Sequence, residues 1–214
     1  MTSGPRRICL RLAYEGTRYS GWQAQPGRAT VQGALAAAIR SISGEEVTLR
    51  GTSRTDAGVH ALDQVAAFST ASHLDAATWC RALNARLPDD VAVRDALEVA
   101  SDFDPLGAAV RKRYRYRVHD ARWPPVLQRH MVWRWRGRLD CGRMREAAAH
   151  LVGEHDFTSF ESTPSTRVSK VRTIHELAVS RPELEADAAG ARSGSRSRAT
   201  ASCTTWSASS PGLW

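Results

Sequence analysis

Long hydrophobic runs are absent from this chain of 214 residues. A transmembrane helix needs about 20 consecutive apolar residues, whereas the longest runs here, around residues 34–39 and 91–93, are much shorter. No charged segment followed by an apolar one opens the chain. We therefore expect no membrane partner and predict a soluble protein of the cytoplasm.

Cysteine is also scarce, and its spacing excludes two classes of small, crosslinked protein. The four cysteines, Cys9, Cys80, Cys141 and Cys203, are widely scattered. They form none of the close pairs that are typical of zinc sites or of a disulfide framework. We predict no metal site.

Lysine is nearly missing, because Lys112 and Lys170 are the only two among 30 basic residues. Acidic residues number 22, which leaves a net charge of +8. Such an excess favours a polyanionic partner, and the planar guanidinium of arginine suits phosphate. A GC-rich genome would produce the same arginine bias without any function, so composition alone leaves both explanations open.

Apolar spacing predicts a first half with the order strand, helix, strand, strand, helix, strand. The expected elements are residues 8–14, 31–42, 47–52, 64–69, 76–87 and 91–93. Thr30 and Asp75 are the expected N-caps of the two helices, and Gly44 and Pro88 are the expected stops.

After residues 103–108 the pattern begins again. We expect a strand at 110–118, an irregular stretch rich in Trp and Pro, a helix at 140–151 and a strand at 168–179. The prediction is an α+β fold of two halves, residues 1–105 and 106–189, each with a sheet backed by helices. Residues 190–214 have no acid and no apolar period, and are predicted to be disordered and without a strand.

A loop of small residues between two expected strands contains one acid, Asp56. Arg54 stands two positions before it and Gly58 two positions after it, so Arg54 can hold the carboxylate ionised while Gly58 permits a tight turn. An oriented carboxylate is a competent nucleophile or base. The same spacing also suits an Asp that only closes an Asx-turn. We interpret His60 as a packing or hydrogen-bonding residue.

Residues 111–117 alternate along an expected strand. One face would carry Arg111, Arg113, Arg115 and Arg117, and the other Lys112, Tyr114 and Tyr116. Phosphates can bind the first face, and a base can stack on a ring of the second. The alternative is an edge strand that charge keeps soluble.

Together these segments resemble the bacterial tRNA pseudouridine synthase A family. The matching stretches are residues 14–23 (Tyr-Glu-Gly-Thr-Arg-Tyr-Ser-Gly-Trp-Gln), 54–60 (Arg-Thr-Asp-Ala-Gly-Val-His), 83–84 with 87–88, 113–116 and 156–160. The resemblance covers about residues 6–180, and the 54–60 string is its most specific part.

The resemblance implies isomerisation of uridine to pseudouridine at positions 38, 39 and 40 of the tRNA anticodon stem-loop, with Asp56 as the nucleophile. It implies that Arg54 lies beside the acid and that Tyr114 packs on the target base. From the alternation of residues 111–117 we expect Arg111, Arg113 and Arg115 to bind RNA. It also implies two RRM-like (ferredoxin-like) halves with antiparallel sheets, a homodimer, and no metal or other cofactor. Attack on the sugar, attack on the base and elimination to a glycal all need the same carboxylate, so the order of bond breaking stays open.

Two stretches depart from the family pattern. Residues 103–106 are Phe-Asp-Pro-Leu, where the family usually has an arginine, so one RNA or structural contact is in doubt. Residues 191–214 lack the family's buried strand and helix, yet GC-rich codons for them, read one base earlier, encode GAEWFEVAGDGFLYNMVRIVAGTL. We hypothesise a frameshift near residues 186–191 and loss of the remaining C-terminal part. The second half would then be incomplete, and the chain weakly active or inactive.

Two other functions are compatible with the sequence. One is a non-catalytic RNA-binding module with the same basic sheet, and the other is a defective truncated product. Substitution of Asp56 separates the first of these from the enzyme, because only the enzyme has an activity to lose.

Overall fold

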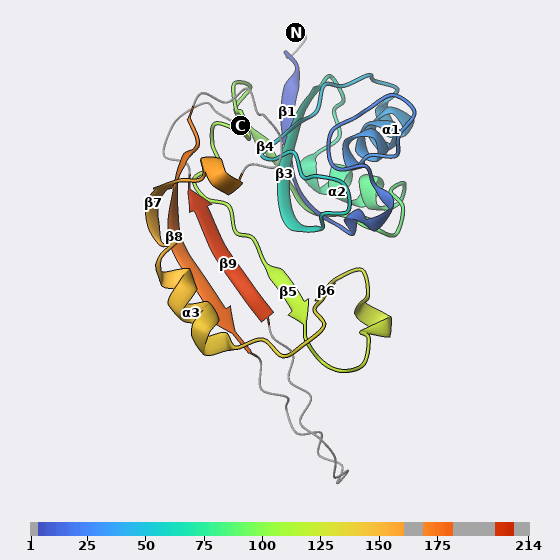
Figure 1. Cartoon of the computed structure of the whole chain (residues 1–214). Helices are drawn as coiled ribbons and strands as arrows, with labels where there is room; N and C mark the ends of the chain where they lie inside the picture. The colour runs from blue at the N-terminus through green and yellow to red at the C-terminus, as the bar shows by residue number, and fades with distance from the viewer. Residues whose placement is uncertain (1–3, 161–168, 182–199, 208–214) are drawn as a thin grey trace. The chain divides into compact units, whose positions relative to one another are not determined.

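The computed structural model describes residues 4–160, 169–181 and 200–207, and divides the chain into two units (Figure 1). The first unit runs to Ala109, and the second runs from Val110 to Ser209. The boundary predicted between residues 105 and 106 lies four residues before this division.

The first unit has the predicted order of elements. They are β1 (Arg6–Tyr14), α1 (Val31–Ser43), β2 (Arg50–Gly51), β3 (Ala61–Thr70), α2 (Ala76–Asn84) and β4 (Val91–Val99), with a short 3₁₀ turn η1 (Gly16–Arg18) after β1. The strands form one antiparallel sheet in the order β2-β3-β1-β4. This order and its two crossover helices define a ferredoxin-like unit, as the RRM-like prediction requires.

Both predicted helix caps of the first unit are confirmed. The side chain of Thr30 accepts a hydrogen bond from the Gly33 amide, and that of Asp75 accepts one from the Thr78 amide. Gly44 ends α1 with a φ of +75°. Helix α2 ends at Asn84, four residues before Pro88.

The core of the first unit lies between the sheet and its two helices, which cover the same face (Figure 1). Alternate residues of β1, namely Ile8, Leu10 and Leu12, are fully buried there. Phe68 of β3 and Trp79 of α2 meet edge to face with ring centroids 5.2 Å apart. Each such side chain contributes about 1.5–3 kcal/mol on burial, so this unit has a firm scaffold for its loops.

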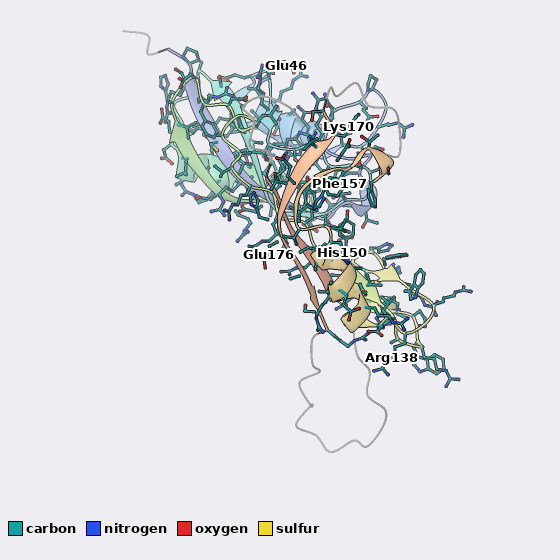
Figure 2. The ribbon with its side chains drawn as sticks, turned by 60° about the vertical axis from the view of Figure 1, so that its left-hand side comes forward. Glu46, Arg138, His150, Phe157, Lys170 and Glu176 are labelled. Carbon is teal, nitrogen blue, oxygen red and sulfur yellow. The ribbon has the colours of Figure 1, made fainter. Side chains whose placement is uncertain are left out.

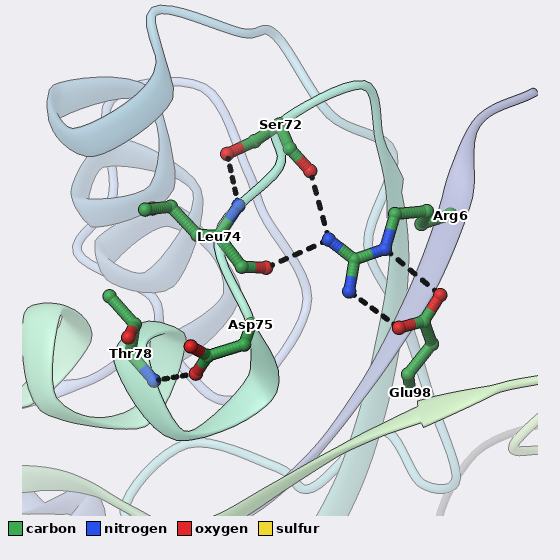
Figure 3. A network of polar contacts seen from close by, with 6 residues as sticks. All are labelled: Arg6, Ser72, Leu74, Asp75, Thr78 and Glu98. Atoms are coloured by element: carbon green, nitrogen blue, oxygen red, sulfur yellow. Dashed lines mark hydrogen bonds and ion pairs between the residues drawn. The ribbon is translucent and has the colours of Figure 1, made fainter. Parts of the chain in front are cut away.

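A polar network fastens the strands to the start of α2 (Figure 3). The Arg6 guanidinium of β1 donates to Glu98 of β4 at 2.9 Å and to the carbonyl of Leu74 at 3.0 Å. It also donates to the carbonyl of Ser72 at 3.4 Å. Asp75, the cap of α2, follows Leu74 directly, so the network fixes where that helix begins.

Strand β2 is shorter than the predicted 47–52, because only Arg50 and Gly51 pair with β3. Gly51 lies against the ring of Trp22, where a Cβ would come within 2.8 Å of the indole. Thr52 continues toward the next loop through a hydrogen bond from its amide to the carbonyl of Val65.

The second unit contains a sheet with the order β6-β5-β9-β8-β7. Its elements are β5 (Tyr116–His119), β6 (Trp133–Arg134), α3 (Cys141–Ala149), β7 (Gly153–Asp156), β8 (Val171–Ser180) and β9 (Thr200–Ser207), with short 3₁₀ turns η2 (Val126–Gln128) and η3 (Thr158–Phe160). The β5–β6 pair is parallel and the other pairs are antiparallel. The α+β class and the predicted helix and strand at α3 and β8 are confirmed.

Two predictions for the second unit are wrong. The strand expected at 110–118 is a strand only from Tyr116 to His119. The tail was expected to lack a strand, but Thr200–Ser207 forms β9 between β5 and β8. Pairing satisfies backbone groups whatever the side chains are, and threonine favours extended structure. Residues 190–199 and 208–214 lie outside the described residues.

No helix in the described ranges is long and apolar enough to cross a membrane.

Candidate active site

The loop between β2 and β3 carries Arg54, Asp56 and His60 in the first unit. Arg54 and Asp56 are exposed, and His60 is half-buried. A loop between strands of a rigid sheet is a common position for reactive side chains. The geometry of this loop depends on the hydrogen bonds and close contacts of its residues.

The segment that follows β1 holds the residue on either side of Asp56. The hydroxyls of Tyr14 and Thr55 share a hydrogen bond of 2.8 Å. The Thr55 carbonyl accepts a hydrogen bond of 2.9 Å from the Trp22 amide. On the other side, the Gly58 amide donates to the carbonyl of Tyr19 at 3.3 Å. The backbone is therefore fixed both before and after the acid.

Two glycines allow these segments to meet backbone to backbone. A Cβ on Gly16 would lie 2.0 Å from the carbonyl oxygen of Val59. A Cβ on Gly21, whose φ is +91°, would lie 2.5 Å from the carbonyl oxygen of Thr55. Real Cβ atoms do not approach backbone so closely, so any side chain at either position would displace the loop.

The loop turns sharply at the acid. The Val59 amide donates to the Asp56 carbonyl at 3.2 Å, and Gly58 permits the expected tight turn with a positive φ of +79°. Buried Gln64 of β3 fixes the other stem by donating to the Ser53 carbonyl at 2.6 Å. Asp56 thus stands at a turn whose two stems are both anchored.

His60 has the hydrogen-bonding role that was predicted for it. Its Nδ1 accepts a hydrogen bond of 3.2 Å from the Gly16 amide. An imidazole nitrogen can accept only when it carries no proton, so this contact fixes the tautomer of the neutral ring. The contact adds another link between the loop and the segment after β1.

The side chain of Asp56 makes no hydrogen bond or ion pair with any residue that the structure describes. The expected ion pair with Arg54 is therefore not formed, and neither is the Asx-turn of the alternative interpretation. The turn is closed by backbone atoms, which leaves the exposed carboxylate available to a substrate.

A half-buried acid supports the segment that holds the loop. Asp90 accepts hydrogen bonds from the Tyr19 phenol at 2.7 Å and from Arg18 at 2.8 Å. Burial and the bond to Asp90 raise the pKa of Tyr19 to about 12. Burial also raises the pKa of Tyr14, against a smaller opposing effect of its bond to Thr55. Both phenols therefore stay neutral near pH 7.

Comparison with known proteins agrees with this geometry. The family model described as tRNA pseudouridine synthase matches residues 12–105 and 147–200, which include the β2–β3 loop. The chain belongs to this family. A tRNA pseudouridine synthase A of Geotalea uraniireducens is 43% identical over 176 residues, which cover 82% of this chain and 72% of that protein.

Two further relatives with the same name are similar to the chain. That of Myxococcus xanthus is 46% identical over 173 residues, covering 81% of this chain and 65% of the relative. That of Acetivibrio thermocellus is 41% identical over 178 residues, covering 83% and 73%. The predicted family is thus confirmed.

The second unit carries the other predicted site residues. Arg111, Arg113 and Arg115 are exposed, whereas Lys112 and Tyr114 are half-buried, so the predicted alternation holds up to residue 115. It fails after that, because Tyr116 is exposed and Arg117 is half-buried. The alternation ends where β5 begins, because exposure along Tyr116–His119 falls steadily from exposed to buried. Arg117 instead donates to Gln128 at 3.1 Å.

The predicted residues fall into two sets. Arg54 and Asp56 share one loop of the first unit, and Tyr114 and the three arginines lie on the segment that leads into β5 of the second unit. The structure brings the members of each set together.

The stretch that departs from the family pattern, residues 103–106, has a structural role. Arg7 donates to the carbonyl of Phe103 at 2.7 Å, and Arg50 lies 3.9 Å from the carboxylate of Asp104. Pro105 is fully buried. In this member of the pseudouridine synthase family, the segment packs on the sheet of the first unit.

Sequence reasoning missed two features. It treated residues 14–23 and 54–60 as separate motifs, and no local pattern showed that they touch. It also passed over the stretch rich in Trp and Pro after β5, whose signal was plain. Residues 121–139 contain five arginines and no acid.

Proposed function

We propose that this chain isomerises uridine to pseudouridine in tRNA, with Asp56 as the catalytic nucleophile. The observation that carries the proposal is the position of Asp56, at a sharp turn anchored on both sides, with a carboxylate that no described residue engages. A carboxylate held in this way can attack without first breaking an ion pair. The names of the relatives, tRNA pseudouridine synthase A, support tRNA as the substrate.

The reaction rearranges bonds within one nucleotide. The bond from N1 of uracil to C1′ of ribose breaks, the base rotates, and a bond from C5 to C1′ forms. The proton on C5 leaves and N1 gains a proton, so substrate and product are isomers. One carboxylate can serve this sequence as a nucleophile toward the sugar or the base, or as a base in an elimination.

The way the enzyme binds its target follows from how a uridine that is stacked within the RNA becomes accessible. The target nucleotide must leave the RNA stack, and an aromatic ring then holds it. We assign this role to Tyr114, and phosphate binding to the exposed Arg54, Arg111, Arg113 and Arg115. In line with the resemblance, the proposed targets are positions 38, 39 and 40 of the anticodon stem-loop, and the proposed enzyme is a cytoplasmic homodimer.

Mapping of pseudouridine in a treated tRNA transcript tests the proposal. Wild-type protein should create pseudouridine at positions 38–40, and Asp56→Ala should create none while it retains the tRNA affinity of the wild type. Retained modification by Asp56→Ala would contradict the assigned nucleophile. Binding without modification by folded wild type would favour a non-catalytic RNA-binding module.

A further inference from the structure

The segment between β5 and α3, residues 121–139, includes η2 and β6, has a concentrated positive charge and is called the Arg/Trp loop below. It contains no Asp or Glu, and all five of its arginines are exposed. They are Arg122, Arg129, Arg134, Arg136 and Arg138. A run of like charge in a folded loop costs repulsion, which a polyanionic partner would relieve.

Exposed aromatic rings accompany these arginines. Trp123, Trp133 and Trp135 have exposed fractions of 60%, 61% and 42%. The Arg122 guanidinium lies over the ring of Trp123 at 5.2 Å, and the rings of Trp133 and Trp135 meet edge to face at 5.5 Å. Arginine planes and exposed indoles together are suited to unstacked bases.

The base of the Arg/Trp loop is fixed. Asp120 accepts hydrogen bonds from the Leu139 amide at 3.0 Å and from Arg181 at 2.8 Å, and Arg181 also donates to the Leu139 carbonyl. Burial raises the pKa of Asp120, but the bonds from Arg181 and Leu139 outweigh this, and the pKa is lowered overall. The Asp120 carboxylate is therefore paired with Arg181 and the Leu139 amide rather than with an arginine of the loop.

We propose that the Arg/Trp loop is an RNA-binding surface separate from the segment of Tyr114. Exposed indoles would also suit a second copy of this chain. However, a symmetric dimer contact brings the same patch of both copies together, and here that would oppose five arginines with five arginines. Phosphates meet this charge without repulsion. Figure 2 labels Arg138, which lies near the end of this loop in the second unit.

The position of the Arg/Trp loop along the chain suits a single RNA partner. Arg111, Arg113 and Arg115 precede β5 and the Arg/Trp loop follows it, so the two basic stretches flank a strand of four residues. A strand of this length spans about 13 Å. The identity of the RNA as tRNA rests on the proposed function, whereas the charge and the exposed rings do not.

A charge-matched pair of variants tests the proposal by fluorescence anisotropy with labelled tRNA. Arg136→Gln with Arg138→Gln should weaken binding about tenfold at 0.1 M salt, and should reduce the slope of log affinity against log salt by about 2. The control, Arg40→Gln with Arg143→Gln, removes the same charge from exposed sites on α1 and α3 and should change affinity less than about twofold. Equal losses in both would overturn the proposal.

The aromatic part has its own test. Trp123→Leu should weaken tRNA binding about fivefold or more, and Trp123→Phe should recover most of the loss because it restores a ring. Unchanged affinity in Trp123→Leu, with an unchanged melting temperature, would contradict stacking by this loop.

Two further measurements separate this proposal from its neighbours. If Leu127→Ser, at a side chain with an exposed fraction of 98%, dissociates a dimer in light scattering and leaves tRNA affinity unchanged, the loop is a self-association surface and the proposal fails. If wild type binds tRNA through this loop but modifies no uridine, the proposed function fails and this proposal stands. If wild type modifies uridine but the two double variants lose the same tRNA affinity, the proposed function stands and this proposal fails.

Discussion

The hydroxyls of Tyr14 and Thr55 lie 2.8 Å apart, and Thr55 is the residue immediately before Asp56. This contact connects the last residue of β1 to the loop that carries the acid. Together with the amide of Trp22 and the carbonyl of Tyr19, it places Asp56 on a frame made by residues 14–22. The segment after β1 therefore positions the loop, and changes in it should affect catalysis without touching the substrate.

Tyr14→Phe tests the side-chain part of this frame. We expect a loss of about 1 kcal/mol in the free energy of unfolding, because one partly buried hydrogen bond is removed. We also expect kcat to fall about tenfold with little change in KM, since a misplaced reactive group slows chemistry more than binding. Denaturant melts and steady-state kinetics measure both. Tyr116→Phe, on an exposed ring, is the stability control, and equal kcat in Tyr14→Phe and wild type would contradict the role.

Gly21→Ala tests the close approach of the two backbones. Gly27→Ala is its matched control, because both glycines have positive φ but a Cβ on Gly27 meets nothing within 4 Å. The control should cost about 1 kcal/mol from backbone strain alone. Gly21→Ala should cost at least about 2–3 kcal/mol and abolish most activity, since the loop must move. Equal melting temperatures for the two variants would show that the close approach of the Gly21 backbone does not constrain the loop.

The pKa of Tyr19 predicts how stability depends on pH. It is raised to about 12 in the folded protein, above the ordinary value of about 10. Between these values the folded state binds more protons, so the free energy of unfolding falls as pH rises from about 10 to about 12 and is unaffected below. The loss is about 2–3 kcal/mol at most. In urea melts, the free energy of unfolding of wild type minus that of Tyr19→Phe should be constant below about pH 10 and fall between about pH 10 and 12. A difference that does not change with pH would contradict the assignment.

The reading frame of the tail is testable by replacement. We propose that substituting GAEWFEVAGDGFLYNMVRIVAGTL for residues 191–214 raises both stability and turnover. In β9 the restored string would replace a polar strand with apolar residues, each worth about 1.5–3 kcal/mol where buried. Thermal melts and initial rates of the two chains answer this. Comparable turnover would show that the present tail suffices.

Local signals in the sequence predicted the first unit well. Thr30, Gly44 and Asp75 act on backbone groups within one turn, so helix ends can be predicted from neighbouring residues alone. The alternation of β1 similarly reflects one buried face. The contact between Tyr14 and Thr55 spans 41 positions, and no periodicity encodes it.

The second unit was harder to predict, because its strands depend on partners more than on their own residues. Residues 110–118 alternate like a strand, yet only Tyr116–His119 finds neighbours in the sheet. Thr200–Ser207 has little apolar pattern, yet it fills a position between two strands. At the site, Asp56 was identified from residue type and motif. The lack of an ion pair between Asp56 and Arg54 depends on side-chain conformation, which the motif does not specify.

Tritium release from tRNA labelled at uridine C5 tests the role of Asp56 most directly, because the C5 proton leaves only when the new carbon–carbon bond forms. Asp56→Asn keeps the shape of the side chain, and Asp102→Asn makes the same change at another exposed aspartate. We predict that wild type and Asp102→Asn release tritium and that Asp56→Asn releases none while it melts like wild type. Release by folded Asp56→Asn at the wild-type rate would contradict the account.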